Sequence, residues 1–353
     1  MKKTIFKSII LIAVSIIISC SNANSEVQLA ENEKLQIFDM HYLIADNEEY
    51  LNVVLEENSK NAFIDYKFYT NQSIGGFGFN TEINDGYISA EVINDNGTNI
   101  ITGNLSDSGF SGKIDDKEVN FVKAKSSLSG AKVVRYTYTN VSPVGDEKTF
   151  DYYSSIFLLN NDKKLASIDK INLDINSDMT SDKLNINKLS DIKNILSNDM
   201  LSYHSDWVES EYPNYASIFQ YGIDYLSEKI ASINRYYYLY IGGAHGIHGN
   251  IRKVYSLSDG KRLKIEDILI DVNDSNLINK VKEKLLFVAS EEDYFDLEDI
   301  SLQENNFYIT SKGLIFTWEI YEIAPYAMGD SEVLFSIDEI KPYLKDEYKS
   351  IFE

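Results

Sequence analysis

Residues 239–263 read LYIGGAHGIHGNIRKVYSLSDGKRL, which indicates a glycine-rich turn with two histidines, then a strand and a tight Asp-Gly turn. The strand is predicted over Ile251–Ser256, and two extended runs before the glycines predict strands over Ser217–Leu226 and Ile230–Ile241. Side chains alternate along a strand, so one face of the second run is predicted to carry Tyr236, Tyr238 and Tyr240.

The rest of the chain beyond residue 130 mixes strand and helix patterns. Further strands are predicted over Val133–Thr139, Tyr152–Leu159, Ile168–Ile175, Phe307–Thr310, Leu314–Ile320 and Glu332–Ile337. Helical spacing joins Leu189 to Met200 and Leu277 to Val288, with Ser275 as the predicted N-cap of the second helix. Ile265–Leu269 is predicted to be a short helical turn, and Asp338 to cap a terminal helix that runs through Leu344.

Residues 35–124 carry turn signals at a near-regular spacing, with short alternating runs between them. Asp-Gly and Asn-Gly supply the positive φ that tight hairpins need, so the segment is predicted to be a small antiparallel all-β meander domain. The signals are Asn84-Asp85-Gly86, Asp95-Asn96-Gly97, Asp107-Ser108-Gly109 and Asp115-Asp116. The segment KSSLSGAK, Lys125–Lys132, is the predicted domain boundary.

Residues 1–20 resemble a lipoprotein signal peptide: three lysines precede an apolar run that ends at Cys20. Cys20 is the single cysteine of the chain and the predicted lipidation site, which would leave residues 21–34 as a polar tether. The expected location is therefore the bacterial cell envelope, outside the cytoplasm, with membrane attachment through a lipid anchor only.

The chain has 33 Lys and Arg against 55 Asp and Glu, a formal net charge of −22. Such a surface repels nucleic acid and anionic lipid and steers basic partners at low salt, although solubility alone also accounts for it.

Four signatures in a fixed order resemble the extracytoplasmic domain of the RsiV family of lysozyme-sensing anti-sigma factors, which is also found attached to the peptidoglycan deacetylase PdaC. The resemblance covers roughly residues 130–350, and it implies an α+β class: a two-part RsiV-like α+β domain over 130–353, preceded by the meander domain. The signatures are Gly242-Gly243-Ala244-His245-Gly246, Ser258-Asp259-Gly260-Lys261, Phe307–Leu314 and Tyr321–Gly329.

The resemblance implies a macromolecule-binding module, with lysozyme or another basic wall-directed protein as the expected partner. Two alternatives stay open: an envelope-maintenance lipoprotein that binds cell-wall glycan or another lipoprotein, and a carboxylate hydrolase. The cytosolic and transmembrane parts of the anti-sigma factor, and the deacetylase domain, have no counterpart in this sequence.

Catalysis and metal binding are not expected. His245 and His248 lack a nearby third histidine or cysteine, so a structural turn is favoured over zinc, and no cofactor is expected. No known catalytic motif is present, and Glu319 and Glu322 are expected to hold the adjacent loop. Binding is expected at a loop whose rings flank a rigid proline, and a packed structural loop is the alternative. The candidate binding residues are Tyr321, Glu322, Pro325, Tyr326 and Met328.

Overall fold

The computed structural model describes residues 33–46, 49–69, 74–94, 97–124, 126, 128, 130–141, 149–177, 189–209 and 214–352. Cys20, the predicted leader and nearly all of the predicted tether lie outside these residues. Within the described residues, none of the helices combines the length and apolar character needed to cross a membrane.

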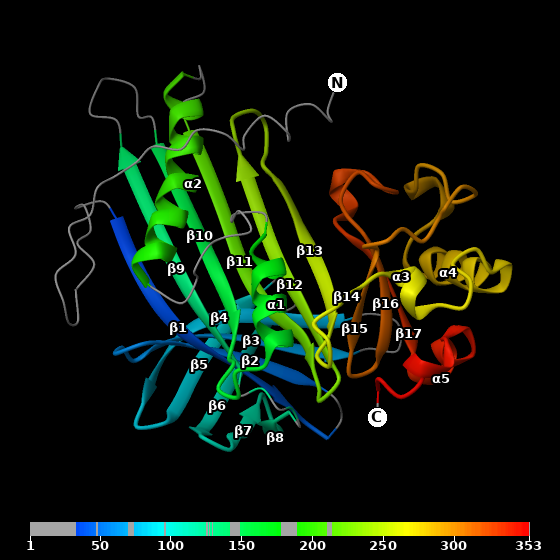
Figure 1. Cartoon of the computed structure of the whole chain (residues 1–353), viewed down its shortest axis with the longest axis horizontal. Coiled ribbons are helices and arrows are strands. Elements are labelled where there is room, and N and C mark those ends of the chain that lie inside the picture. Colours follow the sequence, from blue (N-terminus) through cyan, green and yellow to red (C-terminus); the bar gives the residue numbers. More distant parts are fainter. Residues whose placement is uncertain are drawn as a thin grey trace.

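A single sheet connects most of the described strands, in the order β14-β13-β12-β11-β10-β9-β1-β2-β3-β4-β5-β6-β7-β8 (Figure 1). The strand β1 (Glu33–Ile44) is shared between two halves of this sheet. It pairs with β2 along one edge, and along the other edge its first part pairs with β9 and its end pairs with β8. The first-half strands are β2 (Tyr50–Glu56), β3 (Asn61–Tyr69), β4 (Ile74–Asn84), β5 (Tyr87–Asn94), β6 (Gly97–Ser106), β7 (Gly109–Ile114) and β8 (Lys117–Lys123).

Strands β1 to β8 close into a barrel, because Leu43 and Ile44 of β1 pair with Lys123 and Val122 of β8. The predicted hairpin turns at residues 85–86, 107–108 and 115–116 are confirmed, whereas the turn at 95–96 lies outside the described residues. Inward side chains fill the barrel with an apolar core of its own, which includes Leu51, Val53, Ile64, Phe110 and Phe121.

The predicted fold class is wrong. The described chain is mostly β, a closed eight-stranded barrel with further strands, and not a two-part α+β domain. Local turn signals indicated the hairpins correctly, but closure depends on a pairing between strands at the two ends of the meander, which turn residues do not encode. The domain boundary at Lys125–Lys132 stays a prediction.

The second half of the sheet is open and carries two helices on one face (Figure 1). Its strands β10 and β11 pair in parallel, so the chain between them crosses over through α1 (Ala166–Ile175) and α2 (Leu189–Glu209). The strands are β9 (Ala131–Val141), β10 (Thr149–Leu159), β11 (Asn214–Leu226), β12 (Ile230–Tyr240), β13 (Ile247–Ser256) and β14 (Arg262–Leu263).

The strand predicted over Ile168–Ile175 is in fact helix α1. Its buried residues Ile168, Ile171 and Ile175 follow helical spacing and face the main core. Asn172 exchanges two hydrogen bonds with the backbone of Leu159, and Asn176 does the same with Phe157, at distances of 2.8–3.1 Å. The two asparagines therefore take the place of a neighbouring strand where β11 no longer pairs with β10.

The C-terminal layer is a three-stranded antiparallel sheet, β15 (Phe307–Thr310), β16 (Gly313–Trp318) and β17 (Ser331–Ser336), with α3 (Ile265–Ile268), α4 (Ser275–Val288) and α5 (Ile337–Ile340) beside it (Figure 1). Two predicted caps are wrong by one or two residues. The N-cap of α4 is Asp274, whose carboxylate accepts from the amides of Asn276 and Leu277, and α5 is capped by Ser336. Instead of a continuous helix, a 3-10 turn over Lys341–Tyr343 follows α5.

Candidate functional site

The turn between β12 and β13 and the loop between β16 and β17 meet in one cluster of aromatic and imidazole rings. The ring of His245 stacks on Tyr326, with centroids 4.1 Å apart and planes at 27°. His248 meets the same tyrosine edge-on at 5.5 Å, and Tyr236 lies 6.4 Å from His248. The ring of Tyr321 also lies near Tyr326, with centroids 5.8 Å apart. Two of the sequence signatures thus form one surface, which we call the Tyr326 cluster.

The glycines of the β12–β13 turn give it its backbone path. Gly242 and Gly243 have φ of 95° and 99°, a region that costs a residue with a Cβ about 1–2 kcal/mol. The hydroxyl of Tyr240 donates to the carbonyl of Gly243 at 3.0 Å, and Nδ1 of His245 lies 3.0 Å from the carbonyl oxygen of Gly246. Ala244 and His245 are exposed, so the turn presents the imidazole to solvent.

The β16–β17 loop is held in a compact shape that presents its rings. Tyr321 has a φ of 66° and its amide donates to the carbonyl of Ala324 at 3.1 Å. Pro325 opens a 3-10 turn over Tyr326–Met328, which Gly329 ends with a φ of 69°. Met328 is half-buried against the main core, whereas Tyr321 is 52% exposed. Met328 therefore anchors the loop, and the tyrosines form its outer surface.

The two glutamates of this loop hold backbone and neighbouring side chains. Glu322 accepts from the side-chain amide of Asn306 through one oxygen and from the amide of Glu319 through the other, both at 2.9 Å. Glu319 accepts from the hydroxyl of Tyr237 at 3.1 Å. Burial raises the pKa of the Glu319 carboxyl, and the nearby Asp330 and Glu322 raise it further. The sequence prediction that these residues hold the loop agrees with these contacts.

Gly249 allows the contact between Tyr237 and Glu319. A Cβ at this glycine would lie 2.8 Å from the Tyr237 ring, which crosses β13 at this point. The ring reaches the β16–β17 loop only because position 249 has no side chain.

A buried charged network lies beneath the cluster and joins β13 to the C-terminal sheet. Arg252 forms an ion pair with Glu332 at 2.8 Å and donates to the hydroxyl of Thr317 at 3.1 Å. Its guanidinium lies 4.0 Å from the ring centre of Tyr308 and 3.8 Å from a carboxylate oxygen of Asp224. At the loop's end, Asn250 donates to Asp330 at 3.0 Å. These contacts fix β13 relative to the loop that carries Tyr326.

The Ser258–Lys261 signature lies elsewhere. It forms the turn after β13, whose last residue, Ser256, is nine residues beyond Ile247 and so about 30 Å from the cluster end of the strand at ~3.3 Å per residue. A Cβ at Gly260 would lie 2.5 Å from the carbonyl oxygen of Ser167 in α1, and Lys261 pairs with Asp267 at 2.6 Å. The amide of Lys261 also donates to Asp259 at 3.1 Å. This signature therefore serves packing against α1.

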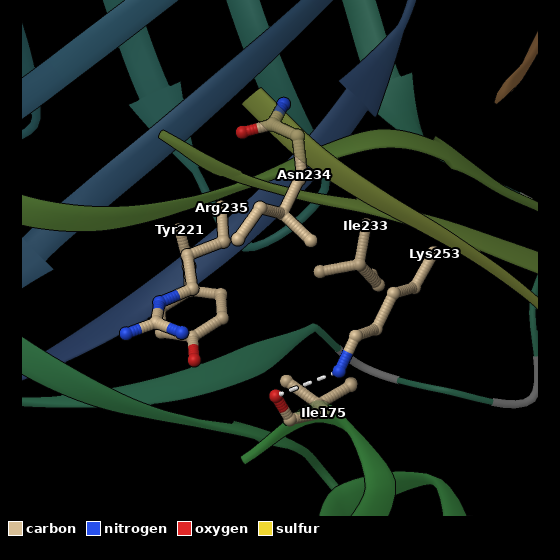
Figure 2. Close-up of a pocket in the computed structure, with 7 residues that line it drawn as sticks. Ile175, Tyr221, Ile233, Asn234, Arg235 and Lys253 are labelled. Carbon is tan, nitrogen blue, oxygen red and sulfur yellow. Dashed lines mark hydrogen bonds between the residues drawn. The ribbon is translucent and has the colours of Figure 1, made fainter. Parts of the chain in front are cut away.

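A cavity on the helix-covered face of the sheet has room for about one water molecule, with a volume of ≈ 10 Å³. Figure 2 shows Lys253 directed from β13 at the end of α1, where its ammonium donates to the carbonyls of Asp174 at 2.9 Å and Ile175 at 3.5 Å. A cation suits the partial negative charge at a helix C-terminus. The cavity is thus a packing feature between α1 and the sheet.

No group of three or more metal-ligating side chains occurs among the described residues, and the cluster includes only two histidines. The sequence singled out His245 in one signature and Tyr321 and Tyr326 in another, but it did not predict that the two signatures lie together. It missed Arg252, one of 33 basic residues, and Asp224 and Asp330, two of 55 acidic residues, because nothing in the sequence distinguishes them from the others. Strand alternation on β12 was the one sequence signal for Tyr236. The pairing of Tyr236 with Asn250 and of Tyr238 with His248 confirms that the two tyrosines lie on the same face of β12.

Residues 266–338 match the family model described as "Protein of unknown function (DUF3298)". The match includes α4, the three-stranded sheet and the β16–β17 loop, but not the β12–β13 turn. A solved DUF3298 family member from Bacteroides fragilis is 19% identical, with a TM-score of 0.50, over 64% of this chain and 96% of its own. A DUF3298 family protein from Pseudomonas aeruginosa is 15% identical over 61% of this chain and 95% of its own, with a TM-score of 0.45. The chain has no match among curated proteins.

Proposed function

We propose that the Tyr326 cluster is the contact surface of a protein-recognition module in a lipid-anchored envelope protein. The observation that carries the proposal is the convergence of two separate sequence signatures into one surface of rings. Exposed tyrosines give large contact areas at low conformational cost, and interface hot spots are rich in them. Ile241 and Ile247, both at least half exposed, flank the same turn and extend the apolar area.

A basic wall-directed protein such as lysozyme is the partner class that we propose. The RsiV-like resemblance of the signatures suggests it, and the net charge of −22 favours encounter with a basic protein. The roles of Glu319 and Glu322 in holding the loop favour recognition over hydrolysis at this pair.

The test is surface-plasmon kinetics of lysozyme on the immobilised full chain at ~0.1 M and ~1 M salt, between which the Debye length falls from ~10 Å to ~3 Å. Acidic residues should set the association rate, which therefore falls at high salt. Tyr326→Ala should raise the dissociation rate about tenfold, equivalent to about 1.4 kcal/mol, and change association little. Tyr326→Phe keeps the ring and should bind like wild type.

Tyr87→Ala is the matched control, because Tyr87 is an exposed tyrosine on the barrel strand β5. It should leave both rates unchanged. Absence of lysozyme binding at ~0.1 M salt would remove lysozyme as a partner. Binding that a folded Tyr326→Ala protein retains in full would place the contact surface elsewhere. Binding of cell-wall glycan that is lost with Tyr326→Ala would favour the glycan-binding alternative.

A further inference from the structure

A second exposed apolar surface lies at the end of α4 and in the segment that follows it, at the outer edge of the molecule (Figure 1). Phe287 is 72% exposed and Phe295 is 59% exposed, and Leu286 and Val288 are also exposed. The buried side of α4 consists of Leu277, Val281 and Leu285, so Leu286, Phe287 and Val288 lie outside the helix's core contact, and Phe295 belongs to the segment that follows. We call the four residues the α4 patch.

The segment after α4 is folded back onto the last turn of the helix. The hydroxyl of Tyr294 donates to the carbonyl of Leu285 at 2.9 Å, which holds the neighbouring Phe295 near that turn. The amide of Phe295 donates to the carbonyl of Ile323 at 2.8 Å, in the loop that carries Tyr326. The α4 patch therefore has a fixed backbone and lies beside the loop of the Tyr326 cluster.

The segment that follows α4 is strongly acidic, whereas α4 itself carries lysines: Lys282 donates to the carbonyl of Glu298 at 2.9 Å and Lys284 pairs with Glu339 at 3.1 Å. From Phe287 to Ser311 the sequence has no lysine or arginine. The acids that follow the patch residues of α4 are Glu291, Glu292, Asp293, Asp296, Glu298 and Asp299. Of these, Asp293 and Asp296 cap local backbone amides, whereas Glu291 and Glu292 are exposed at the opening of this segment.

We propose that the α4 patch docks a basic amphipathic segment of another protein. Apolar side chains of the partner would cover Phe287 and Phe295, while its lysines or arginines would face the acids. A second copy of this chain would bring the same acids against one another, and an anionic lipid surface would be repelled by them, so neither fits as well. The inference is independent of the proposed function, because it needs neither lysozyme nor the Tyr326 cluster.

The test uses the full chain and a short peptide of lysine and leucine at helical spacing, with a lysine–glutamine peptide of equal charge for comparison. Fluorescence anisotropy at low salt should show that the lysine–leucine peptide binds the chain and that the lysine–glutamine peptide binds it more weakly. The double variant Phe287→Ser with Phe295→Ser should weaken it at least about tenfold. Glu291→Gln with Glu292→Gln should weaken binding at low salt and have little effect at high salt.

The matched control is Ile93→Ser with Ile100→Ser, two exposed apolar residues of the barrel strands β5 and β6. It should bind the peptide like wild type, and melting temperatures should show that all three double variants are folded. Tyr326→Ala should still bind the peptide. A failed lysozyme experiment would therefore count against the Tyr326 cluster alone, and a failed peptide experiment against the α4 patch alone.

Equal peptide binding by wild type and by the Phe287→Ser, Phe295→Ser variant would overturn the proposal, as would absence of wild-type binding. Self-association in sedimentation, or binding to anionic vesicles, that this variant alone abolishes would overturn it in favour of a second copy or a lipid surface.

Discussion

Asp224 is the residue whose environment departs most clearly from that of an ordinary carboxylate. It is buried near Arg252, Asn234 and Glu332 and near Tyr42 and Tyr50 of the barrel strands. Burial raises the pKa of its carboxyl to about 6, although Arg252 acts in the opposite direction. In the unfolded chain the pKa is near 3.8. Between about pH 4 and pH 6, the Asp224 carboxyl is therefore protonated in the native state and ionised in the unfolded state.

A native state that binds more protons is stabilised as pH falls, so the stability that Asp224 confers is lost as pH rises through this window. We expect the free energy of unfolding of wild type, relative to Asp224→Asn, to fall by about 3 kcal/mol between pH 4 and pH 7, two pKa units at about 1.4 kcal/mol each. Urea unfolding at several pH values measures the difference. A constant difference between the two proteins would contradict the assignment.

Helix α1 shows at the level of an element what the sequence does and does not predict. Its last eight residues, Ile168–Ile175, were predicted to form a strand, and a segment this short fits either period when isoleucines recur. The contact with β10 determines that the segment forms a helix. The backbone of β10 beyond the β11 pairing needs hydrogen bonds, and Asn172 and Asn176, one helical turn apart, supply them. Long elements such as α2 were predicted correctly because their periodicity extends over several turns.

We expect Asn176→Leu to destabilise the protein by about 1–3 kcal/mol, because it leaves the amide and carbonyl of Phe157 buried without their partner. Leu173→Ala on the exposed side of the same helix is the control, and should lie within about 0.5 kcal/mol of wild type. Chemical denaturation gives both values. Equal effects of the two changes would show that the asparagine contacts do not stabilise α1 on the sheet.

At the scale of the whole molecule, β1 ties the barrel to the rest of the chain. One side of β1 places Leu43 in the barrel core, and the other places Phe38, Met40 and Tyr42 in the main core. The sequence predicted a change of pattern near Lys125–Lys132 but not this shared strand, because pairing of β1 with β9 joins residues about a hundred positions apart. Such long-range pairing leaves no local signal in the sequence.

A protease site placed between Ser126 and Ser127 tests this coupling. We expect cleavage to give two fragments on a denaturing gel that still elute together in size-exclusion chromatography, because Glu33–Met40 remains paired with Ala131–Tyr138. Two separate native peaks would instead support barrel and C-terminal parts that are stable apart.

We propose that the β12–β13 turn and the β16–β17 loop act as one recognition surface. Hydrogen exchange of the full chain with and without lysozyme tests it most directly. We predict that peptides covering 242–249 and 321–329 gain protection together, while the turn at 258–261, at the other end of β13, does not change. Protection confined to one of the two loops, or found at 258–261 instead, would show that the two loops do not bind lysozyme as one surface.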